Sequence, residues 1–331
     1  MTDNLNKKHK TIVFLSLTII ILLIIIMPVC SCAKSEKKRY VIGFVNPNPG
    51  EKEGAQGFLR NMPAYGYIEG KNVTYIKCES RESKCIDDAL KDMVAKKADL
   101  IFTMTTPAAK KAKQVTEGTN IPVVFVMYDA VQSGLVKSLI NPGGNITGVQ
   151  IGGSTPKTLE WLLAIAPDAR HIFVPISFDT GAAHQSLADL KKSAAKLNIR
   201  VTVSEVGTVE ELQASLSSMP KDVGAIFILH SWLIGSNLDV IINKTTKRKI
   251  PVISAGHVDF DDGVVMSYAP RDDRIGEQAA RLAHGILHGT APGDIPVETS
   301  DFFLGINLKT AISAGIKIPD NILLQADFIV R

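Results

Sequence analysis

Short apolar runs alternate with amphipathic stretches along the chain from residue 40 onward, and this alternation restricts the folds that the chain can adopt. The first three runs are apolar on both faces, as the strands of a buried parallel sheet are; they are YVIGFVN (40–46), NVTYIKCE (72–79) and ADLIFTM (98–104). A stretch with helical spacing follows each of them. Strands and helices in alternation predict an α/β fold with parallel sheets.

The same pattern continues to the end of the chain. Further strands are predicted at residues 122–127, 146–152, 171–177, 200–206, 223–229, 251–256, 263–269, 302–307 and 326–330. Helices are predicted at residues 54–66, 85–97, 107–117, 131–140, 156–166, 186–198, 209–219, 238–248, 273–289 and 308–316. Thr208 lies three residues before Glu211, which predicts a helix cap at Thr208.

The number of strands favours two sheets over one. A single sheet would need about ten strands in series, whereas two doubly wound lobes of about five strands each have ordinary dimensions. We therefore expect two Rossmann-like lobes with parallel sheets, joined by a hinge of several strands. The turn Pro142-Gly143-Gly144 lies where the first lobe should end.

Elements that follow a complete second lobe indicate that the chain crosses back between the lobes. We expect an N-terminal lobe of residues 40–148 plus about 270–298, and a C-terminal lobe of residues 149–269 plus about 299–331. The expected hinges lie at the crossings, near Gly148-Val149, Ala269-Pro270 and residues 297–300.

Residues 1–31 have the pattern of a lipoprotein signal peptide. Lysines precede an apolar run at residues 11–29, as in secretory signals. The run is long enough to span a bilayer, so an uncleaved anchor is the alternative. The aliphatic Val29 and the small Ser31 before Cys32 favour cleavage and resemble a bacterial lipobox. We expect lipidation at Cys32, with residues 32–39 as a tether.

Cys78 and Cys85 are separated by six residues. Outside the cytoplasm this spacing permits a disulfide that closes a short loop, and two free thiols are the alternative. No CxxC or HExxH motif occurs, so no metal site is expected. The acidic cluster Asp259, Asp261 and Asp262 lacks the distal glutamate of a calcium loop and is interpreted as a solvated turn.

Composition excludes several classes of function. The net charge is +4, and no basic stripe with interleaved aromatic residues occurs, so no nucleic acid partner is expected. Hydrophobic residues make up 45% of the chain, as in an ordinary folded domain. The GxSxG, GxxxxGK[ST] and GxGxxG motifs are absent, so neither catalysis nor a cofactor is indicated.

Polar and aromatic side chains gather where the predicted strands end. In open parallel sheets, ligands bind beyond the carboxyl ends of strands, where helix N-termini offer free N–H groups. The candidate ligand-binding residues at these exits are Asn46, Thr105, Thr106, Tyr128, Asp129, Ser177, Phe178, Asp179, His230, Trp232 and Gly256. The two aspartates suit an ammonium group, the aromatic rings suit an apolar slot, and the helix after Thr106 suits a carboxylate.

Several of these residues also have a structural interpretation. Thr105 and Thr106 are suited to helix capping, and we expect them to cap as well as to contact ligand. Asp129 could cap a turn or pair with a lysine, and His230 could be a histidine satisfied within the core. Trp232 lies beside serine and glycine in a predicted loop, where it has no evident core role.

Six stretches in these regions resemble one known family. They are GYIEGKNVTY (66–75), ADLIFTMTTPAAKKAK (98–113), IPVVFVMYDAVQSGLV (121–136), NPGGNITGV (141–149), SYAPRDDRIGEQAARLAHGILHG (267–289) and INLKTAISAGIKIP (306–319). Together they resemble the ABC-transporter substrate-binding proteins of the tryptophan/tyrosine-type family, which adopt the type I periplasmic-binding fold. The resemblance runs from about Tyr40 to the C-terminus.

The resemblance implies an extracytoplasmic solute-binding lipoprotein whose lobes close on a small molecule, with an aromatic or other amino acid as the expected cargo. Its partners would be a permease and an ATPase, and its place the bacterial cell envelope, lipid-anchored and facing the periplasm or the exterior. A monomer without cofactor is expected. Three departures bear on the cargo: Thr105-Thr106 replaces the usual Gly-Thr, Asp129-Ala130-Val131 replaces Asp-Pro-Val, and Ala269-Pro270-Arg271 replaces Gly-Pro-Asp.

Two other classes of function compete with this interpretation. A ligand-sensing or surface-interaction protein with the same fold would carry the same lobes without being coupled to transport. An exported hydrolase or transferase would need a nucleophile and a base that converge in space, and no motif indicates such a pair. We expect a binding protein and not an enzyme.

Overall fold

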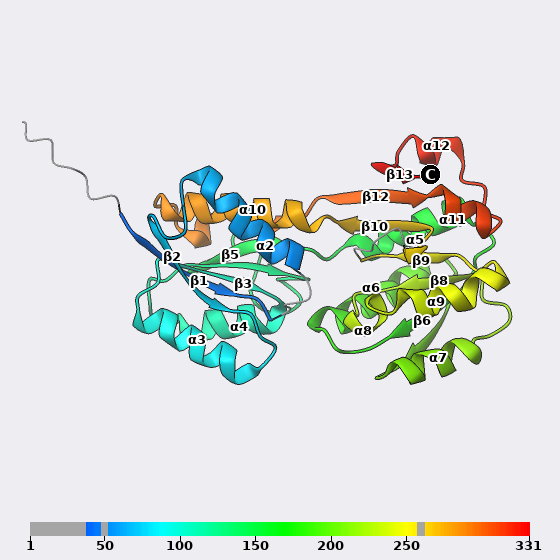
Figure 1. The fold of residues 1–331 in the computed structure, drawn as a ribbon, viewed down its shortest axis with the longest axis horizontal. Coiled ribbons are helices and arrows are strands. Elements are labelled where there is room, and N and C mark those ends of the chain that lie inside the picture. Colours follow the sequence, from blue (N-terminus) through cyan, green and yellow to red (C-terminus); the bar gives the residue numbers. More distant parts are fainter. Residues whose placement is uncertain (1–37, 48–51, 257–261) are drawn as a thin grey trace, which may run out of the picture. The chain divides into compact units, whose positions relative to one another are not determined.

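The computed structural model describes residues 38–47, 52–256 and 262–331. Residues 39–331 form one compact unit that contains two β-sheets (Figure 1). In the part of the chain that is described, no helix combines the length and the apolar character needed to cross a bilayer. The predicted signal peptide, Cys32, most of the tether, Asp259 and Asp261 lie outside the described residues.

Sheet A is the N-terminal sheet, and its six strands are all parallel, in the order β11-β5-β4-β3-β1-β2. Its strands are β1 (Tyr40–Val45), β2 (Val73–Cys78), β3 (Leu100–Met104), β4 (Val123–Met127), β5 (Ile146–Gln150) and β11 (Glu298–Thr299). Every residue of β3 and β4 is buried. This burial on both faces explains why the two strands are continuous apolar runs.

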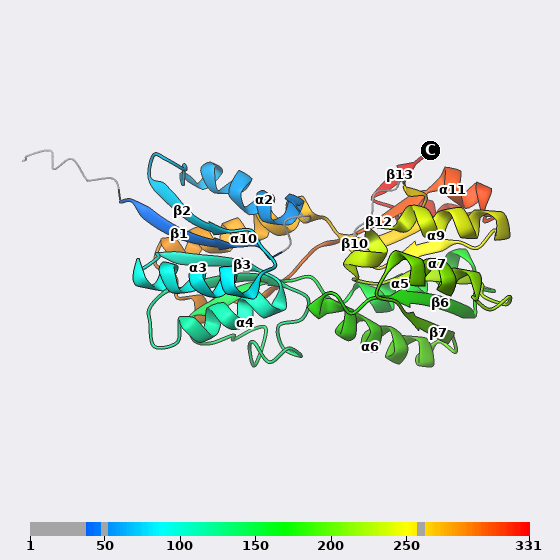
Figure 2. The same cartoon turned by 60° about the horizontal axis from the view of Figure 1, so that its bottom comes forward.

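Helices cover both faces of sheet A (Figure 2). Side chains of α2 (Lys52–Asn61) and α10 (Asp272–Leu287) join the core on one face, and η2 (Met62–Tyr65) follows α2. Side chains of α3 (Ser83–Ala95) and α4 (Thr106–Val115) join the core on the other face.

Sheet B has seven strands in the order β13-β12-β10-β9-β8-β6-β7, with β12 antiparallel to β10 and the other neighbours parallel. Its strands are β6 (His171–Ile176), β7 (Arg200–Glu205), β8 (Ala225–Ile228), β9 (Val252–Ser254), β10 (Met266–Pro270), β12 (Phe302–Asn307) and β13 (Phe328–Val330). The accompanying helices are α5 (Ser154–Ile165), α6 (Gly181–Lys196), α7 (Val209–Ser217), α8 (Trp232–Gly235), α9 (Leu238–Thr245), α11 (Leu308–Ser313) and α12 (Asp320–Leu323), with η3 (Thr246–Arg248) as a short 3₁₀ turn. The 3₁₀ turn η5 (Pro292–Asp294) lies beside β5 of sheet A.

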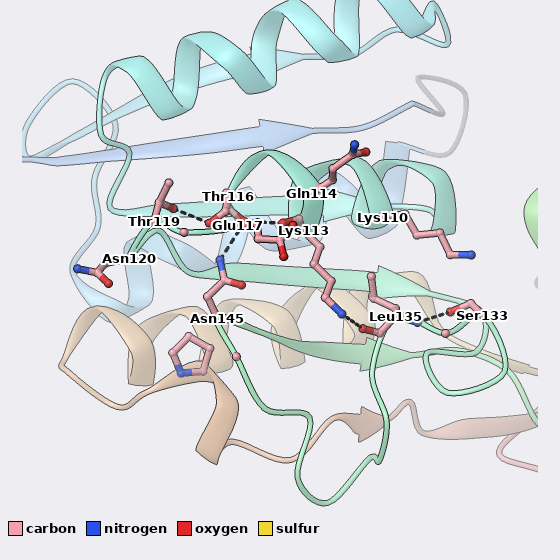
Figure 3. A pocket seen from close by; sticks show the side chains of 14 residues that line it. Lys110, Lys113, Gln114, Thr116, Glu117, Thr119, Asn120, Ser133, Leu135 and Asn145 are labelled. Carbon is pink, nitrogen blue, oxygen red and sulfur yellow. Dashed lines mark hydrogen bonds between the residues drawn. The ribbon is translucent and has the colours of Figure 1, made fainter.

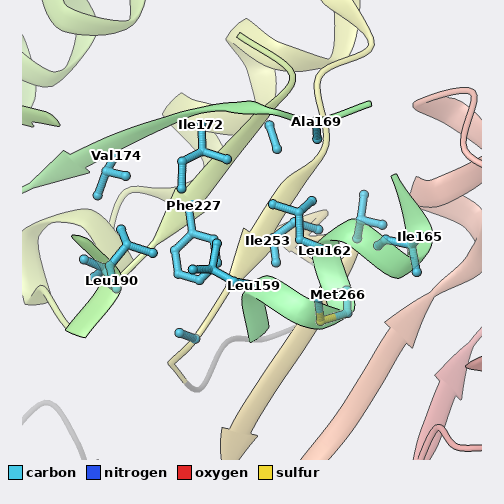
Figure 4. Close-up of a cluster of buried hydrophobic side chains, with 14 of the residues drawn as sticks. Leu159, Leu162, Ile165, Ala169, Ile172, Val174, Leu190, Phe227, Ile253 and Met266 are labelled. Atoms are coloured by element: carbon cyan, nitrogen blue, oxygen red, sulfur yellow. The ribbon is translucent and has the colours of Figure 1, made fainter. Parts of the chain in front are cut away.

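Successive residues of the strands in sheet B serve two cores. Ile172 and Val174 of β6 lie in one cluster with Phe227 of β8 and with Leu159 and Leu162 of α5 (Figure 4). Phe173, between the two β6 residues, packs on the opposite face with side chains of α7 and α9. This alternation is the period of two that a β-strand imposes on its side chains.

The predicted α/β architecture with two mostly parallel sheets is confirmed. Among the described elements, the chain passes between the sheets three times: from β5 to α5, from β10 to α10, and from β11 to β12. We use N-terminal lobe for sheet A with its helices and C-terminal lobe for sheet B with its helices. The lobe boundaries and the hinge role of the crossings stay predictions.

The helix predicted at residues 131–140 is wrong, because this segment forms consecutive turns between β4 and β5. The Asp129 carboxylate accepts hydrogen bonds from the backbone N–H groups of Val131 and Gln132, at 3.0 and 2.8 Å. Gly134 has a φ of 74°, which a continuing helix does not tolerate. The predicted cap at Thr208 is confirmed, since its hydroxyl accepts from the Glu211 N–H at 3.2 Å.

Candidate functional site

The strand order places the predicted site residues at the points where ligands bind in doubly wound sheets. In sheet A, β1 lies between β2 and β3, and in sheet B, β6 lies between β7 and β8. Connections leave in opposite directions at such a switch point, which opens a crevice beyond the strand ends. Asn46 follows β1 and Thr105 follows β3, while Ser177 follows β6 and His230 comes just after β8.

Thr105 has a strained backbone and an unsatisfied hydroxyl. Its φ of 76° and ψ of 150° lie in a region that is almost reserved for glycine. The Oγ1 atoms of Thr105 and of Thr103 are buried without a hydrogen-bond partner among the described residues. The predicted capping by the Thr105 side chain is therefore wrong.

Tyr128 joins the exit of β4 in sheet A to two residues of the C-terminal lobe. Its ring meets the His230 imidazole edge-on, with centroids 4.9 Å apart at 72°. Its hydroxyl donates to Oδ2 of Asp189, in the middle of α6, at 3.4 Å. The structure thus brings together Tyr128 and His230, two of the predicted site residues.

Burial shifts the pKa values of Tyr128, Asp189 and His230. Desolvation lowers the pKa of His230 to about 4, so its imidazole is neutral at pH 7. Burial also raises the pKa of the Tyr128 hydroxyl and that of the Asp189 carboxyl. Nδ1 of His230 is buried without a partner among the described residues. Neutral, partly unsatisfied groups at two strand exits are suited to hydrogen-bonding a small polar ligand.

Trp232 is positioned by Asp179. It is the first residue of the short helix α8, and not a loop residue as the sequence predicts. The Asp179 carboxylate accepts from the N–H groups of Trp232 and Leu233, at 3.1 and 2.6 Å. The indole is 40% exposed, and the Arg81 guanidinium lies 4.5 Å from its ring centroid. Asp179 therefore fixes the backbone at the start of α8, which carries Trp232, and its carboxylate is already engaged.

The other predicted site residues have local partners. Phe178 stacks on His184 with centroids 4.1 Å apart, and the Ser177 N–H donates to the Ser231 hydroxyl at 3.3 Å. The Asp129 carboxylate caps the turn described above, which was one of the alternatives for this residue. A contact of any of these residues with ligand stays a prediction.

The remaining predicted residues, Asn46, Thr106 and Gly256, lie at or next to strand exits. Asn46 is 1% exposed, and its N–H donates to the Cys78 carbonyl at 2.8 Å. A Cβ placed on Gly256 would lie 3.9 Å from the His230 ring, and one on Gly181 would lie 3.5 Å from Cβ of Thr106. Gly256 therefore adjoins His230, and the start of α4 in the N-terminal lobe adjoins the start of α6 in the C-terminal lobe.

The sequence pattern did not indicate Thr103, Arg81 or Asp189. Thr103 lies within an apolar strand, and Asp189 lies in a helix whose pattern is that of any amphipathic helix. Arg81 follows β2 in an exposed loop. Their spacing along the chain carries no signal, because their roles come from groups that are distant in sequence. The one signal for Arg81 is its place just after the predicted strand at residues 72–79.

Cys78 and Cys85 are free thiols in the structure, with their Sγ atoms 2.8 Å apart. Burial, followed by the hydrogen bond with Cys85, raises the pKa of Cys78 to about 12. The disulfide stays a prediction. Within the described residues, no group of three or more His, Cys, Asp or Glu side chains is arranged to hold a metal ion.

A hollow of about 750 Å³ opens beside the C-terminal half of α4, and none of the predicted site residues lines it (Figure 3). Its polar groups serve their own neighbours: the Lys113 ammonium donates to the Leu135 carbonyl, and the Asn145 amide donates to the Thr116 hydroxyl at 2.9 Å. Thr116 follows α4, and Asn145 precedes β5, so the hollow extends to the amino edge of sheet A. Ligands of such sheets bind at the carboxyl edge, and we do not assign a site to this hollow.

Comparison with known proteins supplies the family. The model of the family described as ABC transporter substrate binding protein matches residues 40–330. The chain belongs to this family. Its members bind small molecules outside the cytoplasm and work with the other components of an ABC transporter.

Individual relatives of this substrate-binding family member point the same way. The chain is 27% identical over 268 residues to a tyrosine-binding protein of Clostridioides difficile. The aligned region covers 80% of this chain and 77% of the relative. A ligand-free, open structure of a substrate-binding protein with adhesive properties from Clostridium difficile is 25% identical, with a TM-score of 0.71, covering 88% of this chain and 99% of that chain.

A third comparison concerns the fold alone. The crystal structure of an ABC domain in complex with L-Trp from Streptococcus pneumonia is 24% identical, with a TM-score of 0.76. It covers 88% of this chain and 100% of that chain. The type I periplasmic-binding architecture that the sequence predicts is therefore confirmed by solved structures.

Proposed function

We propose that this substrate-binding protein captures an aromatic amino acid between its two lobes for an ABC importer. The observation that carries the proposal is the similarity to a tyrosine-binding protein over 80% of the chain. A protein with the same fold has L-Trp bound, which agrees with this ligand class.

The chemistry of the strand exits supports this ligand class. The ring of Trp232 and the neutral imidazole of His230 offer apolar and polar surface for an aromatic side chain. The hydroxyl of Thr105, unsatisfied among the described residues, lies at the start of α4. A helix N-terminus with a free hydroxyl donor is suited to the carboxylate of an amino acid.

Calorimetric titration of residues 39–331 with L-tyrosine, L-tryptophan, L-phenylalanine, L-leucine and glucose tests the proposal. We expect dose-dependent binding of at least one aromatic amino acid and none of glucose. A concentration of a hundred times Kd should stabilise the fold by about 2.7 kcal/mol. Binding of glucose alone, or of none of the five compounds, would contradict the proposed ligand class.

Two threonines test where the ligand sits. The double variant Thr105→Val and Thr106→Val keeps the shape of both side chains and removes both hydroxyls. Loss of two hydrogen bonds, at about 1 kcal/mol each, should weaken binding by about thirtyfold. The matched control is Thr290→Val, at an exposed position after α10, and we expect it to bind as the wild type does. Equal affinity in all three proteins would remove Thr105 and Thr106 from the site.

We also propose a lipid anchor at Cys32, because the motif before this cysteine resembles a lipobox. In a bacterial host, the wild-type chain should fractionate with membranes and the Cys32→Ala variant should lose the acyl group. Mass spectrometry of the mature N-terminus measures this directly. An unmodified Cys32 on a cleaved or uncleaved chain would contradict the proposal.

A ligand-sensing or surface-interaction protein is the second candidate. The Clostridium difficile protein of the same fold has adhesive properties, which favours this candidate. Co-purification with a permease and an ATPase from detergent extracts would support transport. Uptake of the bound amino acid that does not depend on this chain would favour the second candidate.

A further inference from the structure

A pair of cysteines flanks the residue that makes a contact between the lobes. The cysteines are Cys78 and Cys85, and the contact is that of Arg81 with Trp232. Cys78 ends β2 and Cys85 lies in the first turn of α3, with their sulfur atoms 2.8 Å apart. Residues 79–84, between them, form the segment that we name the cysteine loop. The cysteine loop carries Arg81, which is exposed and has its guanidinium over the Trp232 ring.

The two ends of this arrangement are well anchored. Cys78 is held at the edge of sheet A, where its carbonyl accepts from the Asn46 N–H. Trp232 is held at the start of α8 by the Asp179 carboxylate. Arg81 therefore connects a fixed strand end of the N-terminal lobe with the indole on a fixed helix start of the C-terminal lobe. The weak point is the cysteine loop itself, whose residues 81–84 are exposed.

We propose that Cys78 and Cys85 form a disulfide, and that this bond fixes the cysteine loop so that Arg81 stays over Trp232 and favours the contact between the lobes. The inference rests on the proposed function, because it needs an extracytoplasmic, oxidising location. A disulfide across so short a loop removes conformational freedom from the segment that carries Arg81. The oxidised protein thus loses less entropy when Arg81 contacts Trp232 than the reduced protein does.

Oxidation proceeds by exchange with an external disulfide, of which glutathione disulfide is the probe. The Cys85 thiolate attacks one sulfur of the probe, forming a mixed disulfide and releasing one glutathione thiolate. The Cys78 thiol then loses its proton and attacks the Cys85 sulfur, and the second glutathione thiolate leaves. The two cysteines lose two electrons and two protons in all, and the probe is reduced to two thiols. Because burial raises the pKa of Cys78, we assign the first attack to Cys85.

The experiment uses residues 39–331, which form one compact unit and carry the family match. This segment contains two cysteines, Cys78 and Cys85, and two tryptophans, Trp161 and Trp232. A Trp161→Phe background leaves Trp232 as the single reporter. Thiol titration after treatment with glutathione disulfide counts free cysteines. Acrylamide quenching of Trp232 fluorescence then measures how well Arg81 covers the indole, without any ligand.

We expect two free thiols after reduction and none after oxidation, and stronger quenching in the reduced protein. Arg81→Ala should be quenched strongly in both states, and so should Cys85→Ser, which cannot form the bond. The matched control is Lys84→Ala, an exposed cation of the same loop, and we expect it to follow the wild type. Persistent thiols after oxidation, or equal quenching of the oxidised and reduced proteins, would overturn the inference.

Ligand affinity provides a second measurement. Loss of a cation–π contact at an exposed site corresponds to about a two- to fivefold change, so reduction should weaken binding of L-tyrosine or L-tryptophan by that factor. Arg81→Ala should bind equally in both redox states. If quenching responds to oxidation while no amino acid binds, the redox coupling is supported and the proposed ligand class fails. If the wild type binds the amino acid with the same affinity in both redox states, the proposal that the disulfide favours the contact between the lobes is wrong.

Discussion

Thr105 occupies a region of backbone space, at φ 76° and ψ 150°, in which a β-branched residue is strained. Residues held there cluster at functional sites. The family to which the sequence is similar usually has glycine at this position, and glycine has no Cβ to clash. The chain thus keeps a hydroxyl at a strand exit despite a cost in stability, which fits a role in contacting the ligand.

Thr105→Gly should raise the free energy of unfolding by about 1 kcal/mol, because relief of the strained φ outweighs the extra chain entropy of glycine. Urea denaturation measures the change. Thr105→Ala is the matched control, since it keeps a Cβ at the same φ and should gain less. A Thr105→Gly protein that is less stable than Thr105→Ala would show that the conformation costs little.

His230 predicts a dependence of stability on pH. The folded protein holds this imidazole neutral down to about pH 4, whereas a free histidine has a pKa of 6.5. Between these values the unfolded chain binds more protons than the folded one, so stability falls as the pH drops from about 6.5 to about 4. The contribution is fully present above this window and amounts to about 3 kcal/mol.

The variant His230→Gln tests this dependence. Free energies of unfolding should be measured in urea at several pH values between 4 and 7.5 for both proteins. We expect the wild type to lose more stability than the variant over this range, by about 3 kcal/mol. Parallel pH profiles would mean that the imidazole is accessible to protons in the folded state.

At the scale of elements, the packing of α2 against α10 depends on two glycines. A Cβ on Gly57 would lie 3.2 Å from Cα of Gly276, and a Cβ on Gly276 would fall inside the contact distance of the Gly57 backbone. The two helices can approach this closely only because neither residue has a side chain. Their contact covers sheet A on the face that carries Phe44 and Phe102.

Gly276→Ala should lower the free energy of unfolding by about 2 kcal/mol, because the added methyl group meets backbone that cannot move aside. Gly285→Ala, on the same helix, is the matched control. A Cβ there has open space around it, so the better helix propensity of alanine should raise stability by up to about 1 kcal/mol. Thermal unfolding of both variants measures the difference. Equal melting temperatures would contradict the close packing.

At the scale of the whole molecule, Tyr128 connects the two lobes, because its hydroxyl contacts Asp189 and its ring contacts His230. A ligand favours the arrangement of the lobes to which it binds best, so contacts between the lobes add to its affinity. Arg81 over Trp232 is a second such contact. The N-terminal lobe thus reaches the C-terminal lobe at two separate strand exits.

Tyr128→Phe keeps the ring contact with His230 and removes the hydrogen bond to Asp189. Loss of this bond, at about 1 kcal/mol, should weaken ligand binding by about fivefold. Isothermal titration measures the affinity. The double variant with Asp189→Asn should show less than the sum of the two single effects, since both act on one bond. Additive effects would show that the two side chains act separately.

The sequence by itself determined the fold class, because strands buried on both faces must be apolar at nearly every position and helices must show a spacing of 3.6. The apolar composition of runs such as ADLIFTM is therefore enough to indicate a parallel sheet. The strand exits follow from the same pattern, which is why Thr105 and His230 could be named. The prediction of a helix at residues 131–140 was wrong, because the turn capped by the Asp129 side chain and the positive φ of Gly134 are incompatible with the helix that the pattern predicts.

The tertiary structure alone decided which exits meet. Tyr128 and Asp189 are 61 residues apart, and Arg81 and Trp232 belong to different lobes. It also decided that Asp179 serves α8 and that the Thr105 hydroxyl has no partner among the described residues. Periodicity reports which face of an element is buried, but the crossings of the chain determine which elements face each other. The chemistry of this binding protein depends on which elements face each other.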